Sequence, residues 1–340
     1  MAAKYATTHK NTKLNSVEMS SLWRGYTIET VAHYMFEYFL VHVEDRDIKK
    51  LIQTCHKMTK EQVELYESLF KKEHFPVPRA ILLEDVNLQA PRLFTDAYYI
   101  NYIKTMTKFM ILEYTNSFTE VTRDDLEKVF SNFISNLKKL ELQATDLMLS
   151  KGLYTHPPLV PVPETIDFVK DQSFIGNMIH SSRPLNVTEV ANLFTVAEAN
   201  ALGKATLMAF SQVAQDTKVK QYLLRGKEIA HKYIHIFNDI LLEEDISTVK
   251  TYDNEITDCQ VSPFSDRFML IQTNLLITKG IGNYGAALAA DQRKDLATHF
   301  ARIMMEVATY GGDGMKLLIG KGWMEQPPLA VNRNKLAAKK

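Results

Sequence analysis

The sequence predicts an all-α protein made of two tandem four-helix bundles that arose by internal duplication. Long segments carry apolar residues at helical spacing, and no stretch shows the sustained alternation of a strand. The second half also repeats the first: "KGLYTHPP" at residues 151–158 matches "KGWMEQPP" at 321–328, an offset of 170 positions. Near the start of each half, residues 14–18 match residues 185–189 at an offset of 171. An offset that drifts by one position over a whole domain indicates one folding unit used twice.

The first helix of each unit is marked by its own capping signal. Asn15 precedes Glu18 by three residues, and Asn186 precedes Glu189 in the same way. The Asn side chain can accept an orphan backbone N–H while the Glu reaches back to the cap, so a capping box is predicted. From Met19 to Leu40, apolar residues then recur at helical spacing.

Three further helices are predicted in the first unit, at about residues 47–72, 94–118 and 122–150, and the second unit repeats them. About twenty residues with several prolines separate helices two and three, while the other connections are short. A long central crossover is typical of ferritin-like bundles, so each unit is predicted to be one. Gly152 and Gly322 mark the ends of the fourth helices, because glycine takes the left-handed backbone and the following proline pair prevents the helix from resuming.

These elements divide the chain into four parts. A first bundle covers residues 14–152, a proline-rich linker 153–184, a second bundle 185–328 and a basic tail 329–340. The linker contains "HPPLVPVPE", a stiff extended segment of polyproline type. A short helix is expected within residues 165–184.

Charge and cysteine content exclude several functions. Forty basic and forty acidic residues give a formal net charge of zero, which argues against nucleic acid and anionic membranes as partners. Two isolated cysteines and the absence of an apolar leader predict a reducing, cytoplasmic location. The apolar stretch at residues 268–290 contains a lysine, three glycines and several amides, so we expect a buried helix there instead of a membrane span. The aromatic and Met content favours a homo-oligomer, and a dimer is expected.

A di-metal centre in a ferritin-like bundle needs a Glu from each of two helices and Glu-x-x-His from each of the other two. One such motif occurs, Glu228 to His231, and His235 follows one turn later. At about 100° per residue, however, all three fall opposite the apolar stripe of their helix. We therefore expect a solvated face there.

The better candidates for metal ligands lie on helix one, where Glu29, His33 and Glu37 share one side. Asn200 and Lys204 occupy the positions of Glu29 and His33 in the second unit, so both bundles should have a polar layer midway along helix one. The layer is either a hydrogen-bonded one, a face turned to the surface, or a metal or small-ligand pocket. We expect no tightly bound cofactor. The first bundle should hold at most one weakly bound metal ion, and the second should hold none, because Lys204 cannot coordinate a metal while it is protonated.

Two further motifs are assigned to packing. "GIGNYG" at residues 280–285 spells G-x-G-x-x-G, but it falls inside a predicted helix instead of a strand–turn–helix, so the small residues are expected to permit close helix contact or a kink. Cys55 lies on an apolar stripe and is expected to be inert. No Ser-His-Asp or Cys-His arrangement can be argued, and no catalytic residue is predicted.

Eight segments, spread in order over almost the whole chain, resemble the family catalogued as domain of unknown function 3231, from spore-forming Gram-positive bacteria. They are "EDVNLQAPRLFTD", "ATDLMLSKGL", "PPLVPVPE", "PLNVTEV", "NALGKATLMAFSQVA", "YLLRGKEIA", "PFSDRFML" and "DLATHF". The resemblance implies a tandem ferritin-like fold and a distant tie to spore coat proteins of the coat-F type.

This resemblance implies a non-enzymatic structural or interaction protein of sporulating bacteria, with spore coat proteins as partners and the spore as a location. It carries over no catalytic residues. The alternative function is a metal- or small-ligand-binding ferritin-like protein with an incomplete site in the first bundle.

Overall fold

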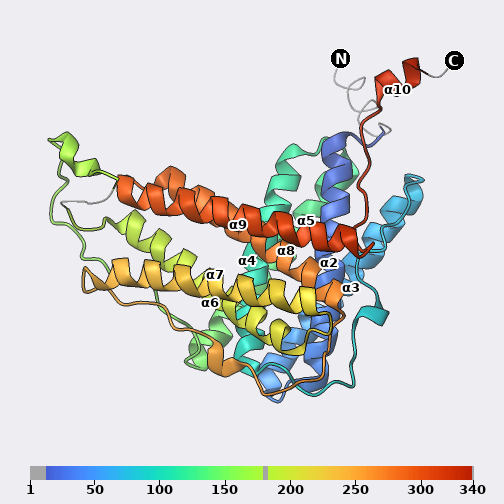
Figure 1. Cartoon of the computed structure of the whole chain (residues 1–340), viewed down its shortest axis with the longest axis horizontal. Coiled ribbons are helices and arrows are strands. Elements are labelled where there is room, and N and C mark those ends of the chain that lie inside the picture. Colours follow the sequence, from blue (N-terminus) through green and yellow to red (C-terminus); the bar gives the residue numbers. More distant parts are fainter. Residues whose placement is uncertain (1–12, 179–182, 339–340) are drawn as a thin grey trace.

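The computed structural model describes residues 13–178 and 183–338, and in these ranges the long regular elements are all helices. They form two consecutive four-helix bundles, which confirms the predicted architecture (Figure 1). The first bundle consists of α2 (Ser16–His42), α3 (Arg46–Lys72), α4 (Asp96–Glu120) and α5 (Asp124–Ser150). The second consists of α6 (Val187–Val213), α7 (Thr217–Leu242), α8 (Asp266–Ala290) and α9 (Lys294–Gly320).

The duplication is visible in where the helices begin. The first two helices of each bundle start 171 positions apart, and the last two start 170 positions apart. The lost position therefore falls between the start of the second helix and the start of the third, which confirms the drift in the sequence offset. The long crossover is also present twice, over residues 73–95 and 243–265, and each copy holds a short 3₁₀ turn, η1 (Leu83–Asp85) or η3 (Asp253–Glu255).

Both predicted capping boxes are formed, and their glutamates do more than cap. Glu18 and Glu189 are buried at 1% and 0% exposure. Glu18 Oε1 accepts the backbone N–H of Arg123 at 3.2 Å, and Glu189 Oε1 accepts that of Arg293 at 3.0 Å. Each capping glutamate thus joins the start of the first helix to the start of the fourth, which explains why a charged side chain is buried there.

Both predicted helix stops are left-handed glycines. Gly152 has φ of 66° and Gly322 has φ of 68°, the conformation that a C-terminal glycine supplies at little cost. The lysine before each glycine binds the N-cap aspartate of the second helix in its own bundle, which the sequence did not reveal. These pairs are Lys151–Asp45 and Lys321–Asp216.

The two bundles run crosswise, with α2 and α4 of the first packed on α6 and α8 of the second (Figure 1). Hydrogen bonds cross this interface: the hydroxyls of Tyr98 and Thr206 lie 2.7 Å apart, and Gln272 donates to the Tyr102 hydroxyl at 3.1 Å. A helix between its own bundle and the other must be apolar on two sides. α2 is such a helix: besides the stripe that contains Leu22 and Tyr26, its other side carries Ile28, Val31, Met35 and Phe39, all of them buried.

The two crossovers meet across this interface in a symmetric arrangement. The N–H of Asn87 donates to the carbonyl of Pro263 at 2.8 Å, and its counterpart Thr257 donates to Leu93 at 3.1 Å. Two isolated antiparallel bridges are related in the same way: Val86–Phe264 and Phe94–Ile256. Reciprocal contacts of this kind define an isologous interface. The bundles thus pack as the halves of a homodimer would, in keeping with their origin by duplication.

The remaining segments are short or extended. A 3₁₀ turn, η2 (Gln172–Ile175), lies where the sequence predicted a short helix, and the tail contains α10 (Arg333–Ala337). Within the described ranges, none of the helices combines the length and the apolar character needed to cross a bilayer. The apolar stretch at residues 268–290 lies in α8, whose first half is largely buried between the bundles.

Candidate functional site

The centre of the first bundle holds a hydrogen-bonded carboxyl group. Glu29, on α2, is 0% exposed and accepts the hydroxyl of Tyr114 from α4. The amide nitrogen of Gln62, turned toward Glu29, lies 3.0 Å from one carboxyl oxygen. Burial raises the pKa of Glu29 to about 8, against the opposing effect of the Tyr114 hydrogen bond. The group is therefore mostly protonated at neutral pH, which suits a polar layer and not a cation.

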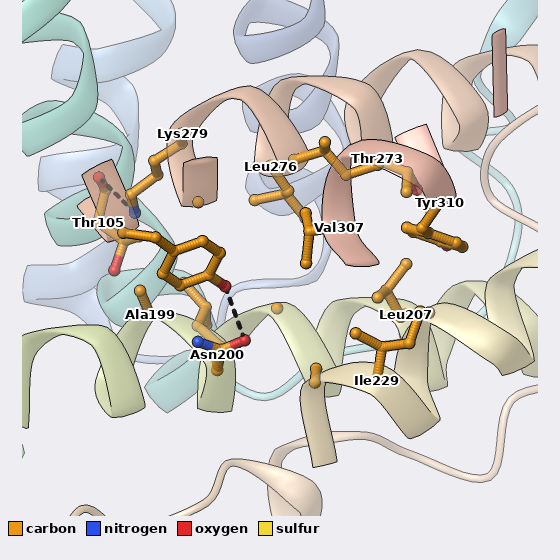
Figure 2. Close-up of a pocket in the computed structure, with 17 residues that line it drawn as sticks. Thr105, Ala199, Asn200, Leu207, Ile229, Thr273, Leu276, Lys279, Val307 and Tyr310 are labelled. Atoms are coloured by element: carbon orange, nitrogen blue, oxygen red, sulfur yellow. Dashed lines mark hydrogen bonds between the residues drawn. The ribbon is translucent and has the colours of Figure 1, made fainter. Parts of the chain in front are cut away.

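The second bundle repeats this layer with a neutral residue. Asn200 takes the position of Glu29, and its Oδ1 accepts the hydroxyl of Tyr284, the counterpart of Tyr114, at 3.0 Å (Figure 2). Both bundles thus have the polar layer that the sequence predicted midway along helix one. Across the described residues, the layer contributes one carboxyl group in the first bundle and an amide in the second.

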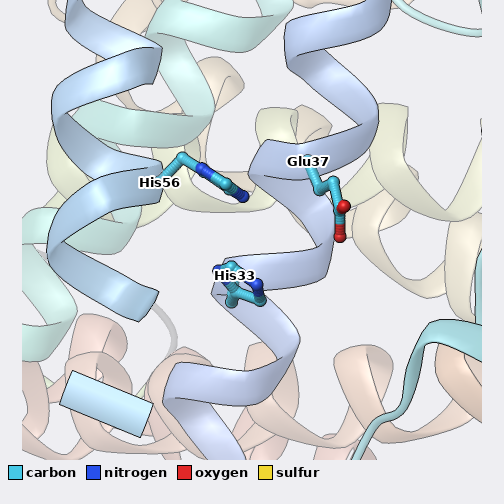
Figure 3. A group of neighbouring side chains, drawn as sticks. All are labelled: His33, Glu37 and His56. Atoms are coloured by element: carbon cyan, nitrogen blue, oxygen red, sulfur yellow. The ribbon is translucent and has the colours of Figure 1, made fainter. Parts of the chain in front are cut away.

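A different group of side chains lies one turn further along α2. His33 and Glu37 from α2 meet His56 from α3, and one ligand atom of each lies within 4.8 Å of the others (Figure 3). All three side chains are half-buried. The two imidazole rings stack with centroids 4.6 Å apart and planes 19° apart. A tetrahedral site with metal–nitrogen bonds of 2.0–2.1 Å would bring the ligand atoms to about 3.4 Å, so small side-chain rotations would close it.

The protonation states of this cluster favour a cation. Burial and the neighbouring His56 lower the pKa of His33 to about 4. Burial also lowers the pKa of His56, with Glu37 opposing and Lys60 adding to the shift. Both imidazoles are therefore neutral at pH 7, the form that coordinates metals.

Hydrogen bonding leaves one ring nitrogen of each histidine available. The Thr59 hydroxyl lies 3.4 Å from His33 Nδ1, which leaves Nε2 of that ring for a ligand. His56 Nε2 is buried and has no hydrogen-bond partner among the described residues. A buried polar atom without a partner carries a cost, and a bound ion would remove it.

The second bundle cannot form the same cluster. The counterparts of His33, Glu37 and His56, 171 positions on, are Lys204, Met208 and Lys227. Lys204 instead pairs with Asp253 at 2.6 Å. Two lysines and a methionine offer no hard donor to a divalent cation, so the His–His–Glu cluster is specific to the first bundle.

The three metal ligands predicted from the sequence therefore do not all lie at one site. His33 and Glu37 lie together, whereas Glu29 faces the bundle centre, apart from them. His56 was missed. The signal was available: α2 and α3 form an antiparallel hairpin over a short turn, and His33 and His56 lie at nearly the same distance from that turn. Residues so placed on antiparallel helices face one another.

The remaining sequence motifs lie on the helices predicted for them. His235 is exposed and His231 half-buried on α7, with Glu228 exposed beside them. Residues 280–285, which spell G-x-G-x-x-G, lie inside α8, but the expected close helix contact is not formed: among the described residues a Cβ on Gly282 would meet nothing within 4 Å, and one on Gly285 would come no closer than 3.8 Å to Met304. Cys55 is 0% exposed in the core.

Comparison with known proteins gives a family and one structural likeness. The family model described as "Protein of unknown function (DUF3231)" matches residues 4–166 and again residues 173–336. A solved structure named as a "putative spore coat protein" from Bacillus halodurans C-125 is similar at 19% identity and a TM-score of 0.41, covering 44% of this chain and 98% of that one. No curated protein matches the chain.

Proposed function

This chain belongs to the DUF3231 family, and we propose that it binds one divalent transition-metal ion between α2 and α3 of its first bundle. The observation that carries the proposal is the convergence of His33, Glu37 and His56 within 4.8 Å. Two neutral imidazoles and a carboxylate suit Zn²⁺ and other late first-row ions. Three protein ligands leave the fourth coordination position of the ion open for water or another small ligand.

Zinc titration of the purified, chelator-treated protein tests this proposal. Calorimetry at pH 7–8 should give one ion per chain, because burial lowers the pKa of both histidines and favours the neutral imidazoles that bind metal. His33→Ala and His56→Ala should each weaken binding by at least about 100-fold, more than loss of an outer-sphere partner does. Glu37→Gln should weaken it less, since an amide oxygen is a poorer donor than a carboxylate.

The control is the histidine pair on α7. The double change His231→Ala/His235→Ala removes two histidines one turn apart, whose rings are 4.4 Å apart, without touching the cluster. It should leave the affinity of the main site unchanged. If this variant abolishes zinc binding and His33→Ala does not, the ion sits on α7 and the proposal fails.

A second candidate function, a structural or interaction protein, is supported by the linker and by the family resemblance. Four apolar side chains of the linker are 80–98% exposed: Leu159, Val162, Ile166 and Phe168. Apolar side chains that gather on one exposed segment mark contact sites. The occupant we propose is a second copy of the chain, in a homodimer. Assembly with spore coat proteins is the same proposal extended to another partner.

The long crossovers also support describing each unit as ferritin-like.

Sedimentation velocity tests the linker contact. The wild type should sediment as a dimer, and the fourfold change of Leu159, Val162, Ile166 and Phe168 to Ser should sediment as a monomer, because the apolar contact area is gone. Met305→Ser, at a 74% exposed position on α9, serves as the control and should remain dimeric. A monomeric wild type would contradict the contact.

A further inference from the structure

A cavity of about 350 Å³ lies where the two bundles and the linker meet. Its walls come from α4 and α5 of the first bundle, α6 and α8 of the second, and residues 154–157 of the linker. Its size is in the range of small-molecule sites, which occur preferentially at domain interfaces. None of the three candidate metal ligands lines it, so it is separate from the proposed metal site.

The lining is rich in charge, although Lys108 is exposed and the other charged side chains are half-buried. Five charged side chains face the cavity: Lys104, Lys108, Glu141, Glu198 and Lys279. Lys104 is bound to Glu141, so that pair is internally neutralised. Lys279 donates to the carbonyl of Thr105 at 3.3 Å (Figure 2), and within the described ranges neither Lys279 nor Lys108 forms an ion pair. With Glu198 as the remaining carboxylate, Lys108 and Lys279 leave one positive charge in excess when Lys279 is protonated.

One acceptor in the wall also lacks a donor. Glu141 Oε1 receives Lys104, but Oε2 is buried and has no hydrogen-bond partner among the described residues. A ligand hydroxyl or amino group placed beside Glu141 would satisfy it. The wall therefore presents one positive charge in excess and one free acceptor.

The duplication shows that this charge is not a by-product of the fold. Each of the five charged residues has a counterpart 170 or 171 positions away in the other bundle, where the same helix faces recur. All five counterparts are uncharged: Asn274, Thr278, Gly311, Thr27 and Phe109. Phe109, at the position of Lys279, is buried in the core at 5% exposure. The charged cavity is therefore particular to one side of the interface.

We propose that this cavity binds a small organic oxyanion that also carries a hydrogen-bond donor, such as a hydroxy-carboxylate. The anionic group lies between Lys108 and Lys279, and the hydroxyl donates to Glu141. A carboxylate and a phosphate share this chemistry, and the test below separates them. Binding joins α4 to α8, so the ligand also holds the two bundles together.

The binding should depend on pH. Burial and the charge of Lys108 lower the pKa of Lys279 to about 7, with Glu198 opposing. An anion beside Lys279 favours its charged form, so binding above pH 7 takes up a proton and affinity falls as pH rises. The other titratable groups around the cavity are Lys104 and Lys108 of α4, Glu141 of α5, Glu198 of α6, and Tyr154 and Tyr252 of the loops.

Calorimetry of the full chain with L-malate, succinate and inorganic phosphate tests the proposal. Malate should bind more tightly than succinate, which lacks the hydroxyl, and about tenfold more tightly at pH 6.5 than at pH 8.5. Phosphate binding in place of malate would identify a phosphate ligand for the same lysines. Lys108→Met and Lys279→Met should each weaken binding at least about tenfold, and Lys279→Met should also abolish the pH dependence.

The control is Lys138→Met, at an exposed position on α5 away from the cavity, which should bind as the wild type does. Thermal melting verifies that each variant is folded. Lys279→Met should melt no lower than the wild type, because it removes a half-buried amine whose charged form is disfavoured by its surroundings. Absence of binding by all three probes up to about 10 mM, or binding that both lysine variants retain, would overturn the proposal.

Discussion

Arg267→Met should lower the free energy of unfolding by roughly 3–5 kcal/mol, the cost of leaving a buried charge without its partner. Arg267 on α8 and Asp85 in the first crossover form an ion pair of 2.7 Å with both side chains 6% exposed. Arg267 also donates to the carbonyl of Ala80. Methionine fills similar space but leaves Asp85 with only the donors of Leu82 and Ser265. Urea denaturation monitored by circular dichroism measures the loss.

The matched control is a surface pair in the second bundle. Arg225 and Asp313 are 2.8 Å apart, but their side chains are 50% and 34% exposed. Arg225→Met should cost no more than about 1 kcal/mol, since exposed pairs contribute little. Equal losses for the two variants would show that the contact between Arg267 and Asp85 is solvated, and that the bundles are held together in another way.

Glu29→Gln should stabilise the protein at alkaline pH and leave it unchanged at low pH. The folded pKa of Glu29 is raised to about 8, above its unfolded value, so the folded state holds a proton that the unfolded state releases. The stabilisation from protonated Glu29 is therefore fully present below its unfolded pKa. As pH rises from that value to about 8, the free energy of unfolding falls by up to about 1.4 kcal/mol per pH unit. Glutamine keeps an acceptor for Tyr114 and cannot ionise.

The measurement is the free energy of unfolding of both proteins at pH 5 and pH 8. We expect a difference on the order of 2–4 kcal/mol in favour of Glu29→Gln at pH 8, and little difference near pH 5. The exposed Glu61 on α3 supplies the control, because Glu61→Gln changes neither a buried group nor a hydrogen bond in the core. A Glu29→Gln variant that is less stable at pH 8 would mean that the carboxylate is charged and paired in the folded protein.

Much of the architecture could be predicted because it depends on local signals. The capping boxes at Asn15 and Asn186 and the left-handed Gly152 and Gly322 fix helix ends through bonds within a few residues. The packing of the bundles could not be predicted in the same way. The apolar side of α2 that includes Met35 faces its neighbours in the assembled chain, and which neighbours those are depends on residues far away in the sequence.

The candidate site was half predicted for a similar reason. His33 and Glu37 lie one turn apart on one helix, so periodicity could pair them. Their third partner, His56, comes from another helix and needs the register of the α2–α3 hairpin. Glu29 shares their side of the helix, but a small rotation about the helix axis places it in the bundle centre against Tyr114.

A crystal of the full chain grown with Zn²⁺ and measured at the zinc absorption edge would locate the bound ion. We expect one anomalous peak per chain between His33, Glu37 and His56, at bonding distance from both His33 Nε2 and His56 Nε2. No peak is expected in the layer of Glu29 and Tyr114 or at Lys204. A peak at Glu29, or zinc bound only by His231 and His235, would show that His33, Glu37 and His56 do not form the metal site.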